Sequence, residues 1–227
     1  MKIEEIKIES KLYPEQLRNI YNPPKKLYFL GKHKELLKQN GIAIVGSRKA
    51  TEYGKKVAMK LSEELSKYGI NIISGLALGI DTYAHTASYN NLGKTIAVMP
   101  CGLNNVVPKA NERLAEEIVN NGGLLISEYS YNANATQYTF VKRDRIQAAL
   151  TDAVLVIKAD EKSGTMHAVK EAQNVNKYVS QYITNNNKYI YNTFDNTEEN
   201  ITSIIKRIKE KHEQEINKKN YEQESLF

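Results

Sequence analysis

Two loops of small residues, each directly after a short apolar run, are the sequence feature best suited to chemistry. A glycine lets a ligand approach the backbone, a serine hydroxyl can donate to an anion, and an arginine offers a fork of donors that matches phosphate. Both loops therefore predict contacts to phosphate groups. The residues assigned to these contacts are Gly46, Ser47 and Arg48 after the run at 42–45, and Ser74 and Gly75 after the run at 70–73.

The spacing around the first loop disfavours two common classes of phosphate-binding enzyme. No Gly-Lys-Ser or Gly-Lys-Thr triplet follows Gly46 at the interval of an ATP-binding loop, and the G-x-G-x-x-G spacing of dinucleotide enzymes is also missing. A tight strand-to-helix turn with an exposed arginine stays open as the alternative interpretation of this loop.

A basic segment with an aromatic neighbour forms a second candidate site. Lys142, Arg143 and Arg145 stand within four residues, and Phe140 comes just before them. Phosphate charge and base stacking are the two features by which proteins hold single-stranded nucleic acid, so this segment favours such a ligand. The alternative is a solvated helix start with Phe140 in the core.

A third loop of small residues, Ser163, Gly164 and Thr165, again follows an apolar run and could donate backbone N–H groups. Asp81, after the second loop, is expected to cap the helix that follows. His85 lies one helical turn later and is expected to be a packed residue, because no second ligand or nucleophile is spaced to join it. We therefore expect no metal site and no catalytic residue.

Apolar runs alternate with helical patterns through the middle of the chain. Strands of continuous Ile, Val, Leu and Ala separated by amphipathic helices indicate a parallel sheet covered on both faces. The sequence therefore predicts an α/β, Rossmann-like, doubly wound and mostly parallel sheet. The expected strands are 42–45, 70–74, 95–99, 124–127, 153–157 and 178–183, and the expected helices begin near 52 and cover 81–89, 111–120, 142–150 and 166–174.

Composition and the flanking segments complete the outline of the chain. We expect an N-terminal extension over 1–40 packed on the sheet edge, a Rossmann-like domain over 41–191, and a helix with a mobile tail over 192–227. The 227 residues carry a net charge of +6, which favours anionic partners. The single cysteine, Cys101, excludes an internal disulfide framework, and no apolar run is long enough for a membrane span, so a cytoplasmic location is expected.

Several motifs in this order resemble the DNA-processing protein A family, also called DprA or Smf. The motifs are GSRKATEYG, SGLALGIDTYAH, GKTIAVMPCGLNNVVPKANERLAEEI, SEYS, F-x-x-R-x-R-I and EKSGT, spread over about residues 10–178. The resemblance implies a single-stranded DNA-binding protein, usually a homodimer, that helps load the recombinase RecA. It implies no catalytic reaction, and we expect no cofactor. It also implies that the three small-residue loops, Phe140 and the basic segment contact DNA.

The sequence departs from the family pattern inside the basic segment. Asp144 stands where the family usually has asparagine, and its carboxylate could pair with Arg143 or Lys142. A related class of proteins that cleaves nucleoside monophosphates has a carboxylate three residues after the threonine of its last loop, where this chain has Ala168. That activity, and nucleotide sensing on the same fold, remain the alternative functions.

The last five residues read QESLF and form a separate motif. They resemble the short peptide by which replication proteins dock on the bacterial sliding clamp, with Gln223, Leu226 and Phe227 as the residues that would bind the partner. The alternative is a helix end that folds back on the domain.

Overall fold

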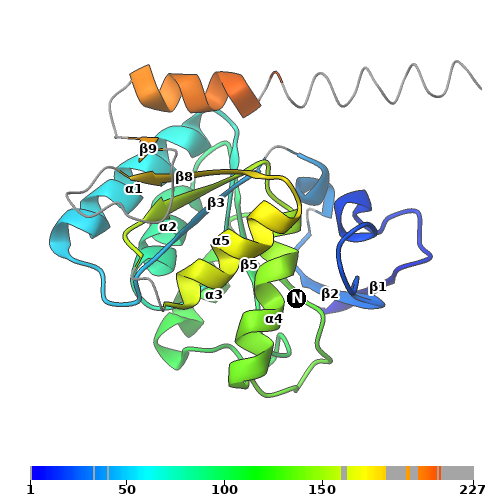
Figure 1. Ribbon diagram of the computed structural model, residues 1–227. Coiled ribbons are helices and arrows are strands. Elements are labelled where there is room, and N and C mark those ends of the chain that lie inside the picture. Colours follow the sequence, from blue (N-terminus) through cyan, green and yellow to red (C-terminus); the bar gives the residue numbers. More distant parts are fainter. Residues whose placement is uncertain are drawn as a thin grey trace, which may run out of the picture.

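The computed structural model describes residues 2–32, 34–39, 41–159, 163–182, 193–194, 199–208 and 210 (Figure 1). The tail residues Gln223, Leu226 and Phe227 lie outside the described residues. The strands are β1 Glu4–Lys7, β2 Lys26–Leu30, β3 Gly41–Gly46, β4 Asn71–Ser74, β5 Thr95–Val98, β6 Leu124–Ser127, β7 Ala153–Ile157, β8 Tyr178–Tyr182 and β9 Thr193–Phe194. The helices are α1 Glu52–Lys67, α2 Ile80–Ser88, α3 Glu112–Asn120, α4 Gln137–Ala149 and α5 Gly164–Asn174, with short 3-10 turns η1 Glu15–Leu17, η2 Lys34–Lys38 and η3 Lys109–Asn111.

The described strands form one sheet in the order β1-β2-β6-β5-β4-β3-β7-β8-β9. All neighbours from β6 to β9 pair in parallel, which confirms the mostly parallel, Rossmann-like class. The chain winds outward from β3 to β6 on one side and from β7 to β9 on the other. Gly46 at the end of β3 pairs with Ile157 at the end of β7, so the point where the winding reverses lies between these strands. Open α/β sheets bind their ligands at such a point.

The central strands are apolar on both faces, because helices cover the sheet on both sides. In β3, Ile42 and Ile44 pack in one cluster with residues of α1 and α2, while Ala43 and Val45 pack in another with residues of α4 and α5. Figure 1 shows α4 and α5 side by side in front of the sheet. The α4–α5 layer matters for the site, because both helices start at the edge where β3 and β7 end.

The N-terminal residues extend the sheet with two antiparallel strands. β2 pairs with β6 and β1 pairs with β2, in the opposite direction to the central strands. Leu17, Leu27 and Phe29 of this segment are fully buried in one cluster with strand residues of β5 and β6. The segment is thus part of the sheet and of its core.

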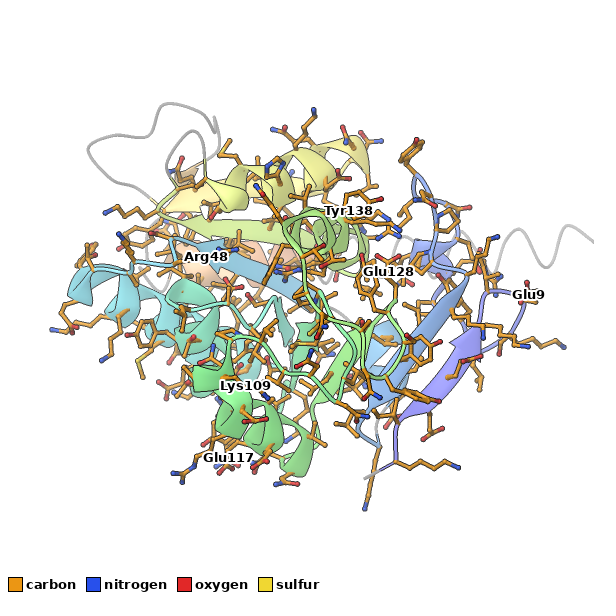
Figure 2. All side chains as sticks on the ribbon, turned by 90° about the horizontal axis from the view of Figure 1, so that it is seen from below. Glu9, Arg48, Lys109, Glu117, Glu128 and Tyr138 are labelled. Atoms are coloured by element: carbon orange, nitrogen blue, oxygen red, sulfur yellow. The ribbon has the colours of Figure 1, made fainter. Side chains whose placement is uncertain are left out.

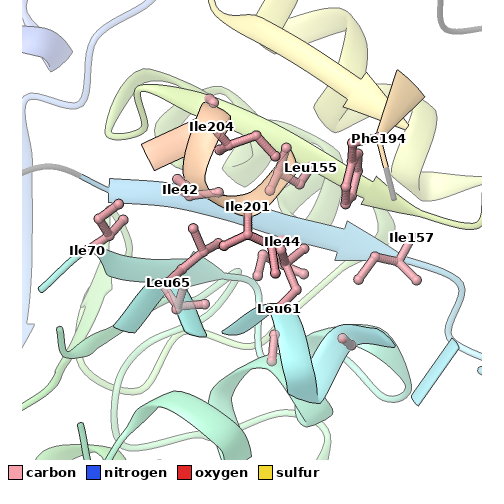
Figure 3. Packing of buried hydrophobic residues seen from close by; sticks show 14 of the residues in the cluster. Ile42, Ile44, Leu61, Leu65, Ile70, Leu155, Ile157, Phe194, Ile201 and Ile204 are labelled. Atoms are coloured by element: carbon pink, nitrogen blue, oxygen red, sulfur yellow. The ribbon is translucent and has the colours of Figure 1, made fainter. Parts of the chain in front are cut away.

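Residues 199–208 are helical and close the core on the α1 side. Their isoleucines repeat at helical spacing, and all four are at least nine-tenths buried against Leu61, Leu155 and their neighbours (Figure 3). These isoleucines are Ile201, Ile204, Ile205 and Ile208. Among the described residues, no helix has the length and apolar character needed to cross a bilayer.

Candidate nucleic-acid interface

A groove of about 950 Å³ opens at the reversal point of the sheet. Its walls are the loop after β3, one face of α4, and the loop after β7 with the start of α5. Eight of the residues that the sequence assigned to DNA contact line it, namely Gly46, Ser47, Arg48, Phe140, Arg143, Ser163, Gly164 and Thr165. The other assigned residues that the structure describes, Ser74, Gly75, Lys142 and Arg145, are not part of its lining.

The loop after β3 places an exposed cation at the mouth of the groove. Ser47 donates its N–H to the carbonyl of Lys158, and its hydroxyl accepts the N–H of Lys49, so these groups hold the loop in shape. Arg48 is exposed, and its guanidinium carbon lies 5.3 Å from the ring centroid of Phe140. Figure 2 shows the molecule from below the view of Figure 1 and labels Arg48. The donor for a phosphate is therefore the Arg48 side chain, held over an aromatic ring.

The start of α5 faces the groove with its backbone donors uncapped. Ser163 is the N-cap residue but makes no capping hydrogen bond, and its buried Oγ has no partner among the described residues. By contrast, Thr51 caps α1 and Thr136 caps α4 through their side chains. Free N–H groups at a helix start, together with the helix dipole, favour an anion at this place.

One face of α4 runs from the mouth of the groove to its floor. Phe140, Asp144 and Gln147 follow one another at helical spacing and all line the groove. Phe140 is half-buried, Asp144 is 8% exposed and Gln147 is 2% exposed, so burial increases along this face. A capping box between Thr136 and Thr139 starts the helix five residues before the predicted start at 142. Phe140 consequently belongs to the helix.

Arg143 forms the floor of the groove and is 5% exposed. Its Nη1 donates to Gln147 Oε1 at 2.8 Å, and its Nε lies 3.4 Å from Asp144 Oδ1, which confirms the expected pairing of these two charges. A Cβ built on Gly75 would overlap the Arg143 guanidinium. Gly75 therefore serves the site indirectly, because it makes the space that Arg143 occupies.

Two carboxyl groups of the groove are buried. Burial raises the pKa of Asp144 to about 6, with Arg143 acting in the opposite direction as the next largest influence. The nearby carboxylates of Asp81 and Glu171 raise it further, and Arg48 lowers it. Burial also raises the pKa of Asp81. Asp144 therefore changes its charge close to neutral pH, in contact with the floor of the groove.

Asp81 and His85 hold the local structure together. The Asp81 carboxylate accepts hydrogen bonds from the N–H groups of Gly75 and Ala77, so it stabilises the loop before α2. The expectation that Asp81 caps this helix is therefore wrong. His85 is fully buried with Nδ1 2.6 Å from Thr95 Oγ1, and burial lowers its pKa to about 3. The prediction of a packed histidine is confirmed. No three His, Cys, Asp or Glu side chains converge on a metal site within the described part of the chain.

Three of the assigned residues outside the groove have structural partners. Arg145 makes a two-pronged ion pair with Glu128, with Nη1–Oε1 and Nη2–Oε2 distances of 2.7 Å, and both side chains are 8% exposed. Lys142 lies 3.5 Å from the same carboxylate (Glu128 is labelled in Figure 2). Ser74 is fully buried and donates to the carbonyl of Ile44. Ser74, Lys142 and Arg145 thus lie outside the groove lining, and their contact with DNA stays a prediction.

Some groove residues were missed by the sequence reasoning. Lys49, Gln147, Lys158 and His167 line the groove, and Lys158 adopts a left-handed backbone with φ of 62° directly after β7. The signal that could have found Lys158 is its place at the end of a buried strand, beside the strand that carries Arg48.

The family model for DNA recombination-mediator protein A matches residues 4–214. The chain belongs to this family. It is 38% identical over 170 residues to the DNA processing protein DprA of Bacillus subtilis, covering 75% of this chain and 57% of that protein. It is 41% identical over 170 residues to Protein Smf of Synechocystis, covering 74% of this chain and 42% of that protein. The chain thus spans about half the length of these curated relatives.

Two solved structures of family members are similar over most of the chain. DNA processing protein A from Helicobacter pylori, described for its single-stranded DNA binding mode, superposes with a TM-score of 0.79 at 30% identity, covering 93% of this chain and 97% of that one. DprA from Streptococcus pneumoniae superposes with a TM-score of 0.75 at 32% identity, covering 91% of this chain and 70% of that one. The fold is therefore that of the family from the antiparallel edge through the parallel strands.

Proposed function

We propose that this chain binds single-stranded DNA in the groove between β3 and β7. The sugar-phosphate backbone lies along the wall made by Arg48, Lys158 and the start of α5, where cations and uncapped N–H groups face the groove. The bases lie toward α4, the wall that presents Phe140. The Helicobacter pylori relative, whose fold is similar to that of this chain, is described by its single-stranded DNA binding mode.

The observation that carries the proposal is the pairing of Arg48 with Phe140. A guanidinium 5.3 Å from the centroid of a half-buried ring puts a phosphate donor and a stacking surface side by side at the mouth of one groove. A mononucleotide enzyme needs an enclosed pocket with a catalytic group, whereas single strands are held by repeated charge and stacking contacts.

Arg48→Ala tests the proposal. We expect the affinity for a fluorescently labelled oligo-dT strand, measured by anisotropy across a salt series, to fall about tenfold and the salt slope to fall by about one. Arg113→Ala is the matched control, because Arg113 is an exposed arginine of α3 that does not line the groove. Equal affinities for the Arg48 and Arg113 variants would contradict the proposed site.

The same assay distinguishes single-stranded DNA binding from the two competing functions, which are nucleotide sensing and cleavage of nucleoside monophosphates. Unlabelled mononucleotides compete with oligo-dT only if the groove is a mononucleotide site. Ala168 is buried on α5 where the cleaving class has its carboxylate, so we propose a binding protein rather than an enzyme. Competition by mononucleotides at concentrations similar to those of the oligonucleotide would favour the alternatives.

The finer roles concern protein partners. The family resemblance leads us to propose that the bound strand is protected and passed to RecA, and that the protein acts as a homodimer.

The C-terminal QESLF is proposed to bind the sliding clamp through Gln223, Leu226 and Phe227. We expect deletion of residues 223–227 to abolish clamp binding in surface plasmon resonance while oligo-dT affinity is retained. Unchanged clamp binding after the deletion would remove this role.

A further inference from the structure

The floor of the groove is chemically different from its mouth. The mouth presents cations, whereas the floor presents both hydrogen-bond donors and a carboxylate. We propose that this floor is a base-reading subsite that prefers guanine over the other bases. The inference rests on the proposed function, since it assumes that a single strand occupies the groove.

Two donors of the floor make no hydrogen bond within the described part of the chain. Gln147 Nε2 is buried and makes no hydrogen bond within the described residues, although Gln147 Oε1 is fixed by Arg143 Nη1 at 2.8 Å. Because the oxygen is held, the amide can turn only its N–H groups toward a ligand. Arg143 Nε is also buried and without a hydrogen bond among these residues, although it lies 3.4 Å from Asp144 Oδ1 in their ion pair. Unpaired buried donors are costly, and a ligand acceptor group would satisfy them.

The acceptor of the floor is the Asp144 carboxylate. On α4 it lies between Phe140 and Gln147, lines the groove and contacts Arg143 through Oδ1 at 3.4 Å. A carboxylate repels phosphate but accepts N–H groups of a neutral base. The deepest part of the groove is thus suited to a base edge and unsuited to the backbone.

Guanine matches this arrangement better than the other bases. Its Watson–Crick edge carries two adjacent donors, N1–H and N2–H, next to the O6 acceptor. The two donors fit one carboxylate, and O6 fits the N–H of Gln147 or Arg143. Thymine offers one N–H between two carbonyls, and adenine and cytosine each offer a single amino group beside an acceptor, so none of them presents two adjacent donors to Asp144.

The helix geometry allows stacking and edge reading in one place. Asp144 lies one helical turn beyond Phe140, about 6 Å along the axis, and Gln147 lies about one turn further. A base that stacks on Phe140 therefore points its edge down the helix toward Asp144 and Gln147. Proteins that hold unstacked bases use this combination of aromatic contact and edge hydrogen bonds.

The test compares three labelled 12-residue strands that differ at one central position: all thymine, one guanine, or one hypoxanthine, which lacks the 2-amino group. A single guanine avoids the four-stranded structures of guanine runs. We expect the guanine strand to bind at least about fivefold tighter than the thymine strand, and the hypoxanthine strand to lose most of that gain. In Asp144→Asn the guanine and thymine strands should bind within about twofold of each other, whereas Glu116→Gln, an exposed charge change on α3, should keep the preference.

The possible results distinguish failure of the guanine subsite from failure of the proposed DNA binding. Equal binding of the guanine and thymine strands by the wild-type protein would overturn the subsite while leaving the proposed function intact. A guanine preference that persists in Asp144→Asn would also overturn it, because the reading group would then lie elsewhere. If none of the strands binds, both the subsite and the proposed function are wrong. The hypoxanthine comparison uses only the wild-type protein, so it does not depend on how the variants fold.

Discussion

At the scale of single residues, the groove depends on how buried charges are arranged. Arg143 and Asp144 are neighbours in the sequence and both are more than nine-tenths buried, yet Arg143 points to Gly75 and Gln147 while Asp144 faces the groove. Arg145, two residues after Arg143, is used for Glu128 instead. Within the basic segment, Arg143 therefore lines the groove, whereas Arg145 forms a structural ion pair with Glu128.

Asp144→Asn should stabilise the protein near neutral pH. The folded state raises the pKa of Asp144 from 3.8 to about 6, so it binds a proton more tightly than the unfolded chain does. The stability gained from protonation is fully present below about pH 4 and is lost as the pH rises through about 6. We expect urea unfolding at about pH 7 to give a gain of about 1 to 3 kcal/mol for the variant, disappearing below about pH 4. A gain independent of pH would contradict the assignment to this carboxyl group.

At the scale of elements, α4 and α5 divide the groove into two different walls. α4 is closed at its start by a reciprocal capping box, so its contribution is made by side chains. α5 has no side-chain cap, so its contribution is made by backbone N–H groups. The two helices pack side by side on one face of the sheet (Figure 1), which keeps the walls at a fixed separation.

Gly164→Ala should separate stability from binding. A Cβ at Gly164, the first residue of α5, meets no described residue within 4 Å, so alanine fits there. Alanine restricts the unfolded chain and favours the helix, which should raise the free energy of unfolding by about 0.4 to 1 kcal/mol. The added methyl group lies where phosphate would approach the N–H donors, so oligo-dT affinity in the anisotropy assay should fall about threefold or more.

Asn174→Ala provides the comparison for this experiment. Asn174 is the exposed last residue of α5, at the end of the helix away from its N-terminus. It should bring a similar small gain in stability with unchanged oligo-dT affinity. Equal affinities for the Gly164 and Asn174 variants would show that the start of α5 makes no contact with the strand.

The parallel elements could be predicted because their signals are local. Most central strands are short runs dominated by Ile, Val, Leu and Ala, and most of the helices between them carry apolar residues at helical spacing. β1 could not be predicted, because EEIK buries only Ile6 and depends on pairing with β2 for its structure. The start of α4 was missed because threonine takes the capping-box position where glutamate or glutamine is the usual signal.

The groove lining was easiest to predict where the residue type and the end of a strand determine a residue's place. Arg48 lies two residues after β3 and Ser163 six residues after β7, so these two paired parallel strands bring both residues to one edge of the sheet. Phe140, Arg143 and Arg145 lie on a helix, where a shift of two residues turns a side chain to another face. Whether each enters the groove depends on partners distant in sequence, such as Gly75 and Glu128, which local spacing does not reveal.

At the scale of the whole molecule, the groove and the core cluster that includes α1, α2 and the helix at residues 199–208 are built on different parts of the sheet. The groove lies at the strand ends between β3 and β7, facing α4 and α5. The helix at residues 199–208 covers the opposite face, where its isoleucines join the cluster of α1 and α2 (Figure 3). Changes in that cluster should therefore alter stability while the geometry of the groove is retained.

Ile201→Ala tests this separation. Ile201 is 4% exposed and packs with core residues of β3, β7 and α1. We expect the free energy of unfolding to fall by about 2 to 4 kcal/mol, because a cavity replaces the buried side chain, and Ile201→Val to cost only about 1 kcal/mol. Oligo-dT affinity, measured where both variants are folded, should equal that of the wild type. A loss of affinity at full folding would mean that the two regions are coupled.

The close approach of Gly75 to the Arg143 guanidinium should make the residues at these two positions co-vary in evolution. Any side chain at position 75 must take the volume of a guanidinium, so it would displace Arg143 and disturb its contact with Gln147. A change at position 75 becomes tolerable only after position 143 has become smaller, and a smaller residue at 143 leaves a cavity that favours a larger one at 75. Homologous sequences should therefore vary at positions 75 and 143 as a pair, although these positions lie far apart in the sequence.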